Sequence, residues 1–453
     1  MSLIHQYKNN GCNIVLDINS GSVHVVDDLV YDIIEAMDRG IEKKQIIEKL
    51  SPIYGEQVQD GYVECEELIE AGQLFSKDIY ADNIEAFTKK ETVVKALCLH
   101  VSHTCNLSCK YCFAQEGEYH GQRAVMPFQV GKQALDFLVA SSGSRRNLEV
   151  DFFGGEPLMN WQVVQDLVSY GRSLEEKNAK KFRFTMTTNG VLLDEEKMEY
   201  LNREMSNVVL SIDGRPEVHN FMRPFPSGAG SYEKILPKFQ EFSKRRGEKD
   251  YYVRGTFTRH NLDFSRDVLH LADLGFRQIS MEPVVAPDDA EYAIRQEDLP
   301  AIYEEYDTLA RQMIEREREG RGFQFFHFMV DLSGGPCVYK RLSGCGSGTE
   351  YLAVTPWGDL YPCHQFVGEE TFRMGTVFDG IQKPEISEQF SACNVYTKPA
   401  CRECFARFYC SGGCAANSYH FHRDMEQVYE IGCALQRKRI ECAIWIQAAL
   451  ACD

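Results

Sequence analysis

The sequence lacks an excess of positive charge, a secretory signal and any apolar run long enough to cross a membrane. Its 453 residues carry 49 Lys and Arg against 67 Asp and Glu, a formal net charge of -18, which disfavours a nucleic-acid partner. The first ten residues are polar and show no signal-peptide pattern. We therefore expect a cytoplasmic protein with neither nucleic-acid nor membrane partners.

Cysteine, by contrast, is abundant. The chain has 17 cysteines, and in a reducing compartment so many thiols favour metal binding over disulfide bonds. The odd number also argues against complete internal pairing.

Three of the cysteines form the run Cys105-Asn-Leu-Ser-Cys109-Lys-Tyr-Cys112, directly after an apolar, strand-like stretch. Three thiolates on one tight loop suit a four-iron cluster that leaves one iron open, whereas a zinc loop would need a fourth ligand. The run resembles the signature of radical S-adenosylmethionine (SAM) enzymes. In that family the open iron chelates SAM, and an electron from the cluster splits SAM into methionine and a 5′-deoxyadenosyl radical.

Strand-like and helix-like segments alternate from Val93 to about Pro283, which predicts a parallel sheet with its site at the carboxyl ends of the strands. The radical SAM resemblance makes this α/β region a partial (β/α)6 barrel over residues 93–320. The six predicted strands are 94–102, 148–153, 182–187, 208–212, 251–258 and 278–282.

Segments at the ends of these strands match radical SAM motifs in the family's order. They are Gly154-Gly155-Glu156-Pro157, Thr187-Thr188-Asn189-Gly190 and Ser211-Ile212-Asp213-Gly214, followed by Arg223. The resemblance implies that the first segment receives the SAM ammonium group and that Arg223 pairs with the SAM carboxylate, a role suited to its planar fork. The contacts implied for SAM are Tyr111, Phe113, Gly154, Gly155, Glu156, Pro157, Thr188, Asn189, Ser211 and Arg223. Glu282, at the end of the sixth strand, is either a cofactor contact or a structural carboxylate.

Residues 1–85 form a separate predicted unit. A hairpin over 13–26 and helices over 28–39, 43–50 and 55–70 give the pattern of a winged helix. The acidic helices would repel phosphate, so DNA binding is disfavoured. The unit resembles the peptide-recognition domain that precedes many radical SAM enzymes, in which a leader peptide pairs with an edge strand. A merely structural domain is the alternative.

Residues 334–453 form a cysteine-rich C-terminal unit. Its spacing resembles the SPASM domain, which carries two auxiliary iron-sulfur clusters. The resemblance assigns Cys401, Cys404, Cys410 and Cys433 to the outer cluster, and Cys345, Cys363 and Cys414 to the inner one. Either Cys337 completes the inner cluster or a substrate thiolate does.

The whole chain most resembles radical SAM/SPASM maturases of the SCIFF type, which form thioethers in cysteine-rich ribosomal peptides (sactipeptides). The resemblance implies SAM and three [4Fe-4S] clusters as cofactors. It also implies a precursor peptide with a leader as substrate and a flavodoxin- or ferredoxin-type electron donor. The deoxyadenosyl radical removes hydrogen itself, so no general base is required, and Asp213 is the nearest candidate carboxylate. Open alternatives are carbon-carbon crosslinking, anaerobic sulfatase maturation and, in a different class, a zinc-binding regulator.

Overall fold

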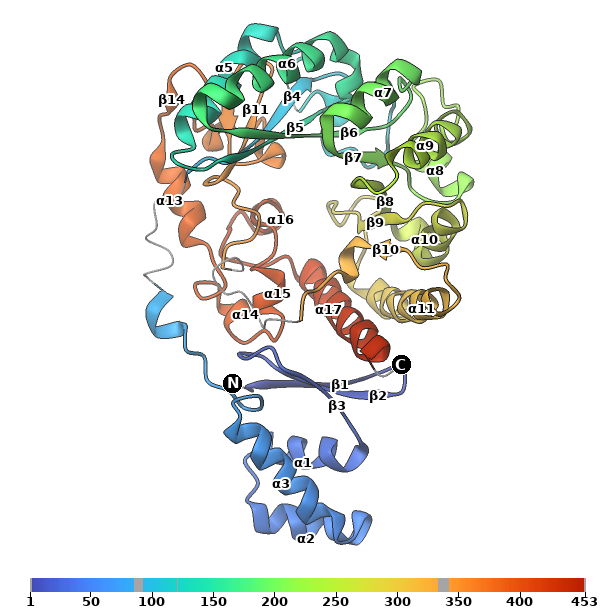
Figure 1. Ribbon diagram of the computed structural model, residues 1–453, viewed down its shortest axis with the longest axis vertical. Helices are drawn as coiled ribbons and strands as arrows, with labels where there is room; N and C mark the ends of the chain where they lie inside the picture. Colours follow the sequence, from blue (N-terminus) through green and yellow to red (C-terminus); the bar gives the residue numbers. More distant parts are fainter. Residues whose placement is uncertain (1, 85–92, 120, 333–341, 452–453) are drawn as a thin grey trace.

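The computed structural model describes residues 2–84, 93–119, 121–332 and 342–451. Cys337 and Cys452 lie outside these residues. Figure 1 shows a curved sheet with helices on its outer side, cysteine-rich segments within the curve, and a small N-terminal unit below.

The N-terminal unit is a three-stranded antiparallel sheet, in the order β1-β2-β3, with three helices on one face. Its strands are β1 (Ile4–Asn9), β2 (Cys12–Asp17) and β3 (Val23–Val26), and its helices are α1 (Asp28–Asp38), α2 (Lys43–Tyr54) and α3 (Gln57–Glu70). The predicted hairpin and helices are present. Strand β1 was not predicted, because its few apolar residues do not alternate with polar ones.

Strand β2 is buried on both faces. Val15 packs into the core of the three helices, while Ile14 and Leu16 join the main core of the molecule. Successive side chains of a strand point to opposite faces, so the small sheet lies between the core of the three helices and the main core and packs against both. The N-terminal unit is therefore fixed to the rest of the protein by apolar packing.

All six strands predicted between residues 94 and 282 are present, side by side and parallel. Strand β4 is buried along its whole length, as expected of a strand covered on both faces. The strands are β4 (Ala96–Ser102), β5 (Asn147–Gly154), β6 (Lys181–Thr188), β7 (Met205–Ser211), β8 (Tyr251–Phe257) and β9 (Gln278–Pro283), with the short β10 (Gln324–Phe325) beyond them. The sheet is open, which confirms the α/β partial barrel.

Helices cover the outer face of this sheet (Figure 1). The crossover connections between parallel strands supply them, as the chain must return to the same edge each time. They are α5 (Phe128–Ser141), α6 (Trp161–Asn178), α7 (Glu195–Glu204), α8 (Pro216–Met222), α9 (Tyr232–Arg246), α10 (Phe264–Asp273) and α11 (Leu299–Arg318).

The cysteine-rich region extends the same sheet. β11 (Tyr351–Val354) pairs in parallel with β4, and β12 (Asp359–Tyr361), β13 (Gly375–Thr376) and β14 (Gly380–Ile381) continue the order. After them come the helices α13 (Pro384–Ala392), α14 (Pro399–Arg402), α15 (Arg407–Cys410), α16 (Ala415–His422) and α17 (Glu430–Ala451). The sheet pairing joins the C-terminal cysteines rigidly to the strand that precedes Cys105.

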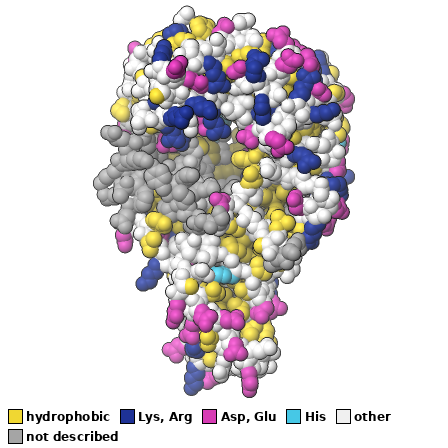
Figure 2. Space-filling view, viewed as in Figure 1, with side chains coloured by type: hydrophobic (Ala, Val, Ile, Leu, Met, Phe, Trp, Pro, Cys, Tyr) yellow, Lys and Arg dark blue, Asp and Glu magenta, His cyan; other side chains and the backbone are white. Residues whose placement is uncertain are grey.

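Among the described segments, no helix is both long and apolar enough to pass through a membrane. Acidic side chains gather over the N-terminal helices in Figure 2. That surface is unsuited to a phosphate backbone.

Candidate functional site

Cys105, Cys109 and Cys112 lie on the loop that follows β4, at the carboxyl end of the sheet. Burial raises the pKa of Cys105 to about 12, and the neighbouring Cys109 and Cys112 act in the same direction. Burial likewise raises the pKa of Cys109 to about 11. The loop therefore brings three partly buried thiols together, and a metal cluster would displace their protons.

Two backbone hydrogen bonds hold this loop against the end of α8. The N–H of Ser108 donates to the carbonyl of Pro224 at 2.9 Å, and the N–H of Lys110 donates to the carbonyl of Met222 at 2.9 Å. The loop that carries the cysteines is thus held in place by backbone hydrogen bonds. Arg223 lies between these two anchor points, beside the thiols.

The glycines after β5 let a second loop touch the cysteine loop. A Cβ on Gly154 would lie 2.2 Å from the carbonyl oxygen of Ser102, and a Cβ on Gly155 would lie 2.2 Å from that of Thr104. Gly154 also has a φ of 126°, which favours glycine. The predicted Gly154-Gly155-Glu156-Pro157 segment therefore packs against the residues just before Cys105.

Glu156 links the ends of β5 and β6. Its carboxylate is buried and accepts hydrogen bonds from the Thr188 hydroxyl at 2.7 Å and the Asn189 N–H at 2.8 Å. Burial raises the pKa of Glu156 to about 6, although these donors oppose the shift. The Asn189 amide lies 3.7 Å from the Cys105 sulfur. Glu156 thus fixes Thr188 and Asn189 at the end of β6, and Asn189 in turn contacts Cys105.

Asp213 is fully buried after β7 and is surrounded by donors. One carboxylate oxygen accepts from Arg223 Nε at 3.0 Å and from the Thr256 N–H at 3.0 Å. The other accepts from the Tyr111 hydroxyl at 2.6 Å. Asp213 therefore holds two of the predicted SAM contacts, Tyr111 and Arg223, in place.

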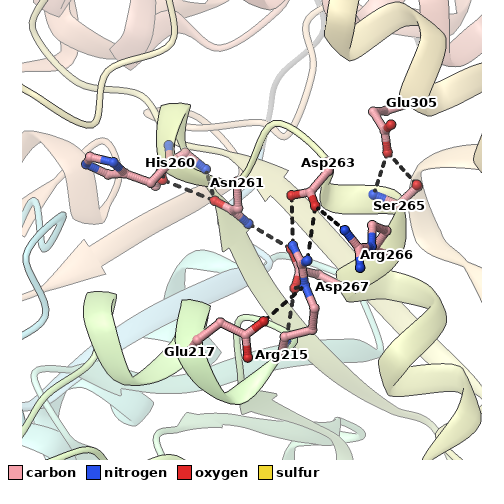
Figure 3. A network of polar contacts seen from close by, with 10 residues as sticks. Arg215, Glu217, His260, Asn261, Asp263, Ser265, Arg266, Asp267 and Glu305 are labelled. Carbon is pink, nitrogen blue, oxygen red and sulfur yellow. Dashed lines mark hydrogen bonds and ion pairs between the residues drawn. The ribbon is translucent and has the colours of Figure 1, made fainter.

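A second ion-pair network holds the chain just beyond Asp213 (Figure 3). Arg215 Nε lies 2.7 Å from Asp267 Oδ1, and its Nη2 lies 2.7 Å from Asp263 Oδ1. Both aspartates belong to or border α10. The turn after β7 is thus fixed to an outer helix, which keeps the Asp213 carboxylate in place.

The other predicted SAM contacts lie at the same edge of the sheet. Phe113 is half-exposed, with its ring 5.6 Å from that of His364. Pro157 is buried in the turn after Glu156, and Ser211 ends β7 half-buried. Phe113, Pro157 and Ser211 therefore lie at the carboxyl ends of the strands β4, β5 and β7.

Cys401, Cys404, Cys410 and Cys433 together line a cavity of about 240 Å³. Burial raises the pKa of Cys401 to about 12, and Cys410, Cys433 and Cys404 act in the same direction. Four thiols around one cavity form a donor set that fits a four-iron cluster. The four residues assigned to the outer cluster thus meet at one place.

Cys345, Cys363 and Cys414 also come together. Burial raises the pKa of Cys363 to about 12, and the nearby Cys414 and Cys345 act in the same direction. These three residues are the set assigned to the inner cluster. Whether Cys337 joins them stays a prediction, since that residue lies outside the described part of the chain.

In the described residues, no three His, Cys, Asp or Glu side chains converge closely enough to hold a single metal ion. The three cysteine sets stay predicted donor sets for iron-sulfur clusters. The remaining cysteines of the described residues join none of the sets. Cys65, Cys98 and Cys442 are buried, and Cys12 and Cys393 are half-buried.

The sequence did not single out Arg254, His327 or Arg439, which surround Glu282. Glu282 lies 3.7 Å from Arg439 and 3.5 Å from His327, so it faces the C-terminal helix. One feature of the sequence could have indicated this cluster, namely a charged residue inside a central parallel strand, because such strands are normally apolar on both faces. Arg254 in β8 is that residue.

Residues 94–237 match the family model of a 4Fe-4S single cluster domain. An uncharacterized protein of Archaeoglobus fulgidus is 26% identical over 76% of this chain and 79% of its own length. The cysteine-type anaerobic sulfatase-maturating enzyme of Clostridium perfringens (strain 13) is 25% identical over 69% of this chain and 86% of its own. The radical SAM cyclopropyl synthase TigE of Paramaledivibacter caminithermalis is 25% identical over 38% of each chain.

Solved structures share the fold. anSMEcpe with bound AdoMet and the Kp18Cys peptide aligns with a TM-score of 0.65 and 20% identity, covering 79% of this chain and 99% of that one. Streptococcus suis SuiB bound to S-adenosylmethionine aligns with a TM-score of 0.54 and 15% identity, covering 96% and 99%. In its cysteine loop, its matched iron-sulfur domain and its fold, this chain resembles the radical SAM/SPASM peptide maturases.

Proposed function

We propose that this chain is a radical SAM enzyme that installs a thioether between a cysteine sulfur and a carbon atom of a ribosomally made, cysteine-rich peptide. The observation that carries the proposal is the position of one cavity of about 520 Å³. It is bordered by the end of β9 at Glu282 and by Cys345, Cys410, Cys414 and Cys433. A peptide bound there would lie between the barrel and both auxiliary cysteine sets.

Cys105, Cys109 and Cys112 would hold the first cluster, and Arg223, Glu156 and Asn189 would border SAM. When bound, the cluster and SAM supply a radical that removes hydrogen from the peptide. Tyr111 and Arg223 are fixed by Asp213 before any ligand arrives, which lowers the cost of ordering them on binding. The chain's own part is thus to bind and orient.

The outer and inner cysteine sets would hold the second and third clusters. One of them would accept the surplus electron after the sulfur-carbon bond forms. A flavodoxin- or ferredoxin-type donor would reduce the first cluster, which places the reaction in the cytoplasm. We assign residues 93–320 to the radical SAM part and residues 334–453 to the SPASM part.

We further assign residues 1–85 to leader-peptide recognition, with β3 as the docking edge. The other edge, β1, is covered by the C-terminal region. There His5 stacks on Phe405 with ring centroids 3.5 Å apart, and the Tyr7 hydroxyl donates to the Glu441 carbonyl at 3.0 Å. An exposed edge strand can accept a peptide as an added strand. The likeness to SuiB over 96% of this chain supports a shared overall arrangement.

Sulfatase maturation is the second candidate, favoured by the match to 86% of the Clostridium perfringens enzyme. Mass spectrometry after thiol alkylation separates the two. The reconstituted protein would be incubated anaerobically with SAM, reductant and a cysteine-rich precursor peptide that carries a leader segment. Thioether formation removes two hydrogens and one alkylatable thiol per event. Two hydrogens lost with every thiol intact would indicate carbon-carbon coupling, and conversion of cysteine to formylglycine would indicate sulfatase-type maturation.

A further inference from the structure

The large cavity contains a charged group that the SAM and cluster assignments leave unused. Glu282, His327 and Arg439 line the cavity from the barrel side and from α17. Cys345 and Cys414 line the same cavity. The inference drawn from this cavity rests on the proposed peptide-modifying function.

Glu282 is an ionised carboxylate without a hydrogen bond from the described part of the chain. The guanidinium groups of Arg254 and Arg439 each lie 3.7 Å from it, at ion-pair distance only. Burial raises the pKa of Glu282, but this is outweighed by His327 when its ring is protonated and by the permanent charges of Arg439 and Arg254, so the pKa lies below its usual value. At neutral pH the Glu282 side chain is thus a hydrogen-bond acceptor that lacks a donor within the described ranges of the chain.

Arg439, in turn, is a hydrogen-bond donor with an unsatisfied N–H group. Its Nε donates to the Tyr306 hydroxyl at 2.8 Å, while its buried Nη2 has no hydrogen-bond partner among the described residues. The side chain is 7% exposed. Buried polar groups are rarely left without a partner, because each one costs free energy. Glu282 and Arg439 therefore form an ion pair at 3.7 Å without a hydrogen bond between them. The Glu282 side chain remains 31% exposed and lines the cavity.

The local charge selects the kind of group that can complete this site. Burial lowers the pKa of His327 to about 3, so the ring is neutral at pH 7. Two arginines then face one carboxylate, and a further cation such as a lysine side chain is disfavoured. A carboxylate accepts hydrogen bonds but cannot donate them. A neutral N–H or O–H donor fits both conditions.

We propose that Glu282, held by Arg254 and Arg439, accepts a hydrogen bond from the substrate peptide, given by a main-chain N–H or a side-chain hydroxyl close to the modified residue. The bond would fix the peptide between the SAM end of the barrel and the inner cysteine set. Glu282 is in this account a substrate-binding residue that determines which part of the peptide is presented.

The test combines Glu282→Gln with changes in the peptide. The glutamine keeps the size of the side chain but loses the charge, and we expect the peptide KM to rise about 10- to 100-fold with SAM binding unchanged. Peptides in which single amide N–H groups are replaced by ester oxygens, or single Thr and Ser by Val and Ala, would then be compared on both enzymes. The change that removes the partner should weaken binding to the wild type but add little to Glu282→Gln.

Glu305→Gln is the matched control, since Glu305 accepts from Ser265 on the outer helices and lies outside the cavity. Tyr306→Phe is a second, milder variant that releases Arg439 and should raise the peptide KM in the same direction. Unchanged peptide KM in Glu282→Gln, or full additivity with every peptide change, would overturn the proposal and leave only ordered water at Glu282. Failure of the wild type to modify the peptide would instead reject the proposed function.

Discussion

Arg223 Nε lies 3.0 Å from Asp213 Oδ1 inside the protein, where the aspartate is fully buried. The same carboxylate also accepts from the Tyr111 hydroxyl. The Asp213 carboxylate is thus occupied by two of the residues predicted to contact SAM. Its role would be seen in SAM binding before any peptide chemistry.

Asp213→Asn should therefore weaken the binding of SAM. Removing the charge leaves a buried guanidinium without its counter-ion, and we expect the SAM Kd to rise roughly tenfold. Cleavage of SAM without peptide should fall in parallel, measured as 5′-deoxyadenosine released. Asp273→Asn, which breaks an ion pair to Arg316 on the outer helices, should change neither quantity. Normal SAM cleavage with loss of peptide modification alone would instead make Asp213 a base.

Gly154→Ala should disrupt the contact between the β5 loop and the cysteine loop. The added methyl would collide with the Ser102 carbonyl, and we expect a loss of about 3 kcal/mol or more in unfolding free energy. Iron content should fall as well. Gly275→Ala is matched in backbone, with a φ of 93° and nothing within 4 Å of its Cβ, and should cost only about 1–2 kcal/mol. Equal effects of the two substitutions would contradict the packing argument.

Iron analysis should resolve the three cysteine sets. Reconstituted protein is expected to hold about twelve irons with matching sulfide, and alanine at all of Cys105, Cys109 and Cys112 should remove about four. Alanine at Cys401 and Cys404 should remove about four others. Cys65→Ala, at a buried thiol in the N-terminal core, should remove none. Zinc in place of iron would support the regulator alternative.

Strand β3 should bind the leader peptide. Val25 is 46% exposed on this strand, so Val25→Asp should weaken binding of a fluorescent leader peptide by about tenfold, as an apolar contact is replaced by a charge. Ile53→Asp is the control, because Ile53 is an exposed apolar residue on α2. Binding that fails equally in both variants, or in neither, would argue that the N-terminal unit is structural.

Buried histidines should make the protein sensitive to mild acid. Burial lowers the pKa of His219 to about 4, whereas an unfolded histidine titrates near 6.5. Between these values the unfolded state binds more protons, so the stabilising contribution is complete above pH 6.5 and falls by about 1.4 kcal/mol per pH unit below it. Asp151 and Glu156 have the opposite effect on stability. Burial raises the pKa of each to about 6, so the folded state binds more protons than the unfolded state and their contribution to stability grows as the pH falls.

The informative quantity is therefore the difference between the wild type and His219→Gln in anaerobic urea unfolding at pH 7, 6 and 5. The wild type should lose stability relative to the variant as the pH falls. A difference that does not change with pH would show that His219 titrates normally in the folded protein.

The six barrel strands were predictable because long apolar runs alternate with amphipathic helices. The loop with Cys105, Cys109 and Cys112 was predictable from spacing, since its three thiols are close in sequence. The two C-terminal cysteine sets came from the resemblance to the SPASM domain, because their members are spread along the chain. Strand β1 was missed, as its burial comes from Ile4 and Tyr7 packing on two different cores. The pairing of β11 with β4 and the Glu282–Arg439 pair were also missed, because both join residues remote in sequence and only tertiary packing brings them together.

Deuterium transfer would test the central claim most directly. The peptide would be made with deuterium on the carbons of its non-cysteine residues and incubated anaerobically with the reconstituted enzyme, SAM and reductant. The account predicts one deuterium in each 5′-deoxyadenosine formed together with a thioether, and none when Cys105, Cys109 and Cys112 are alanine. A thioether formed with unlabelled 5′-deoxyadenosine, or by the triple variant, would contradict radical abstraction from the peptide.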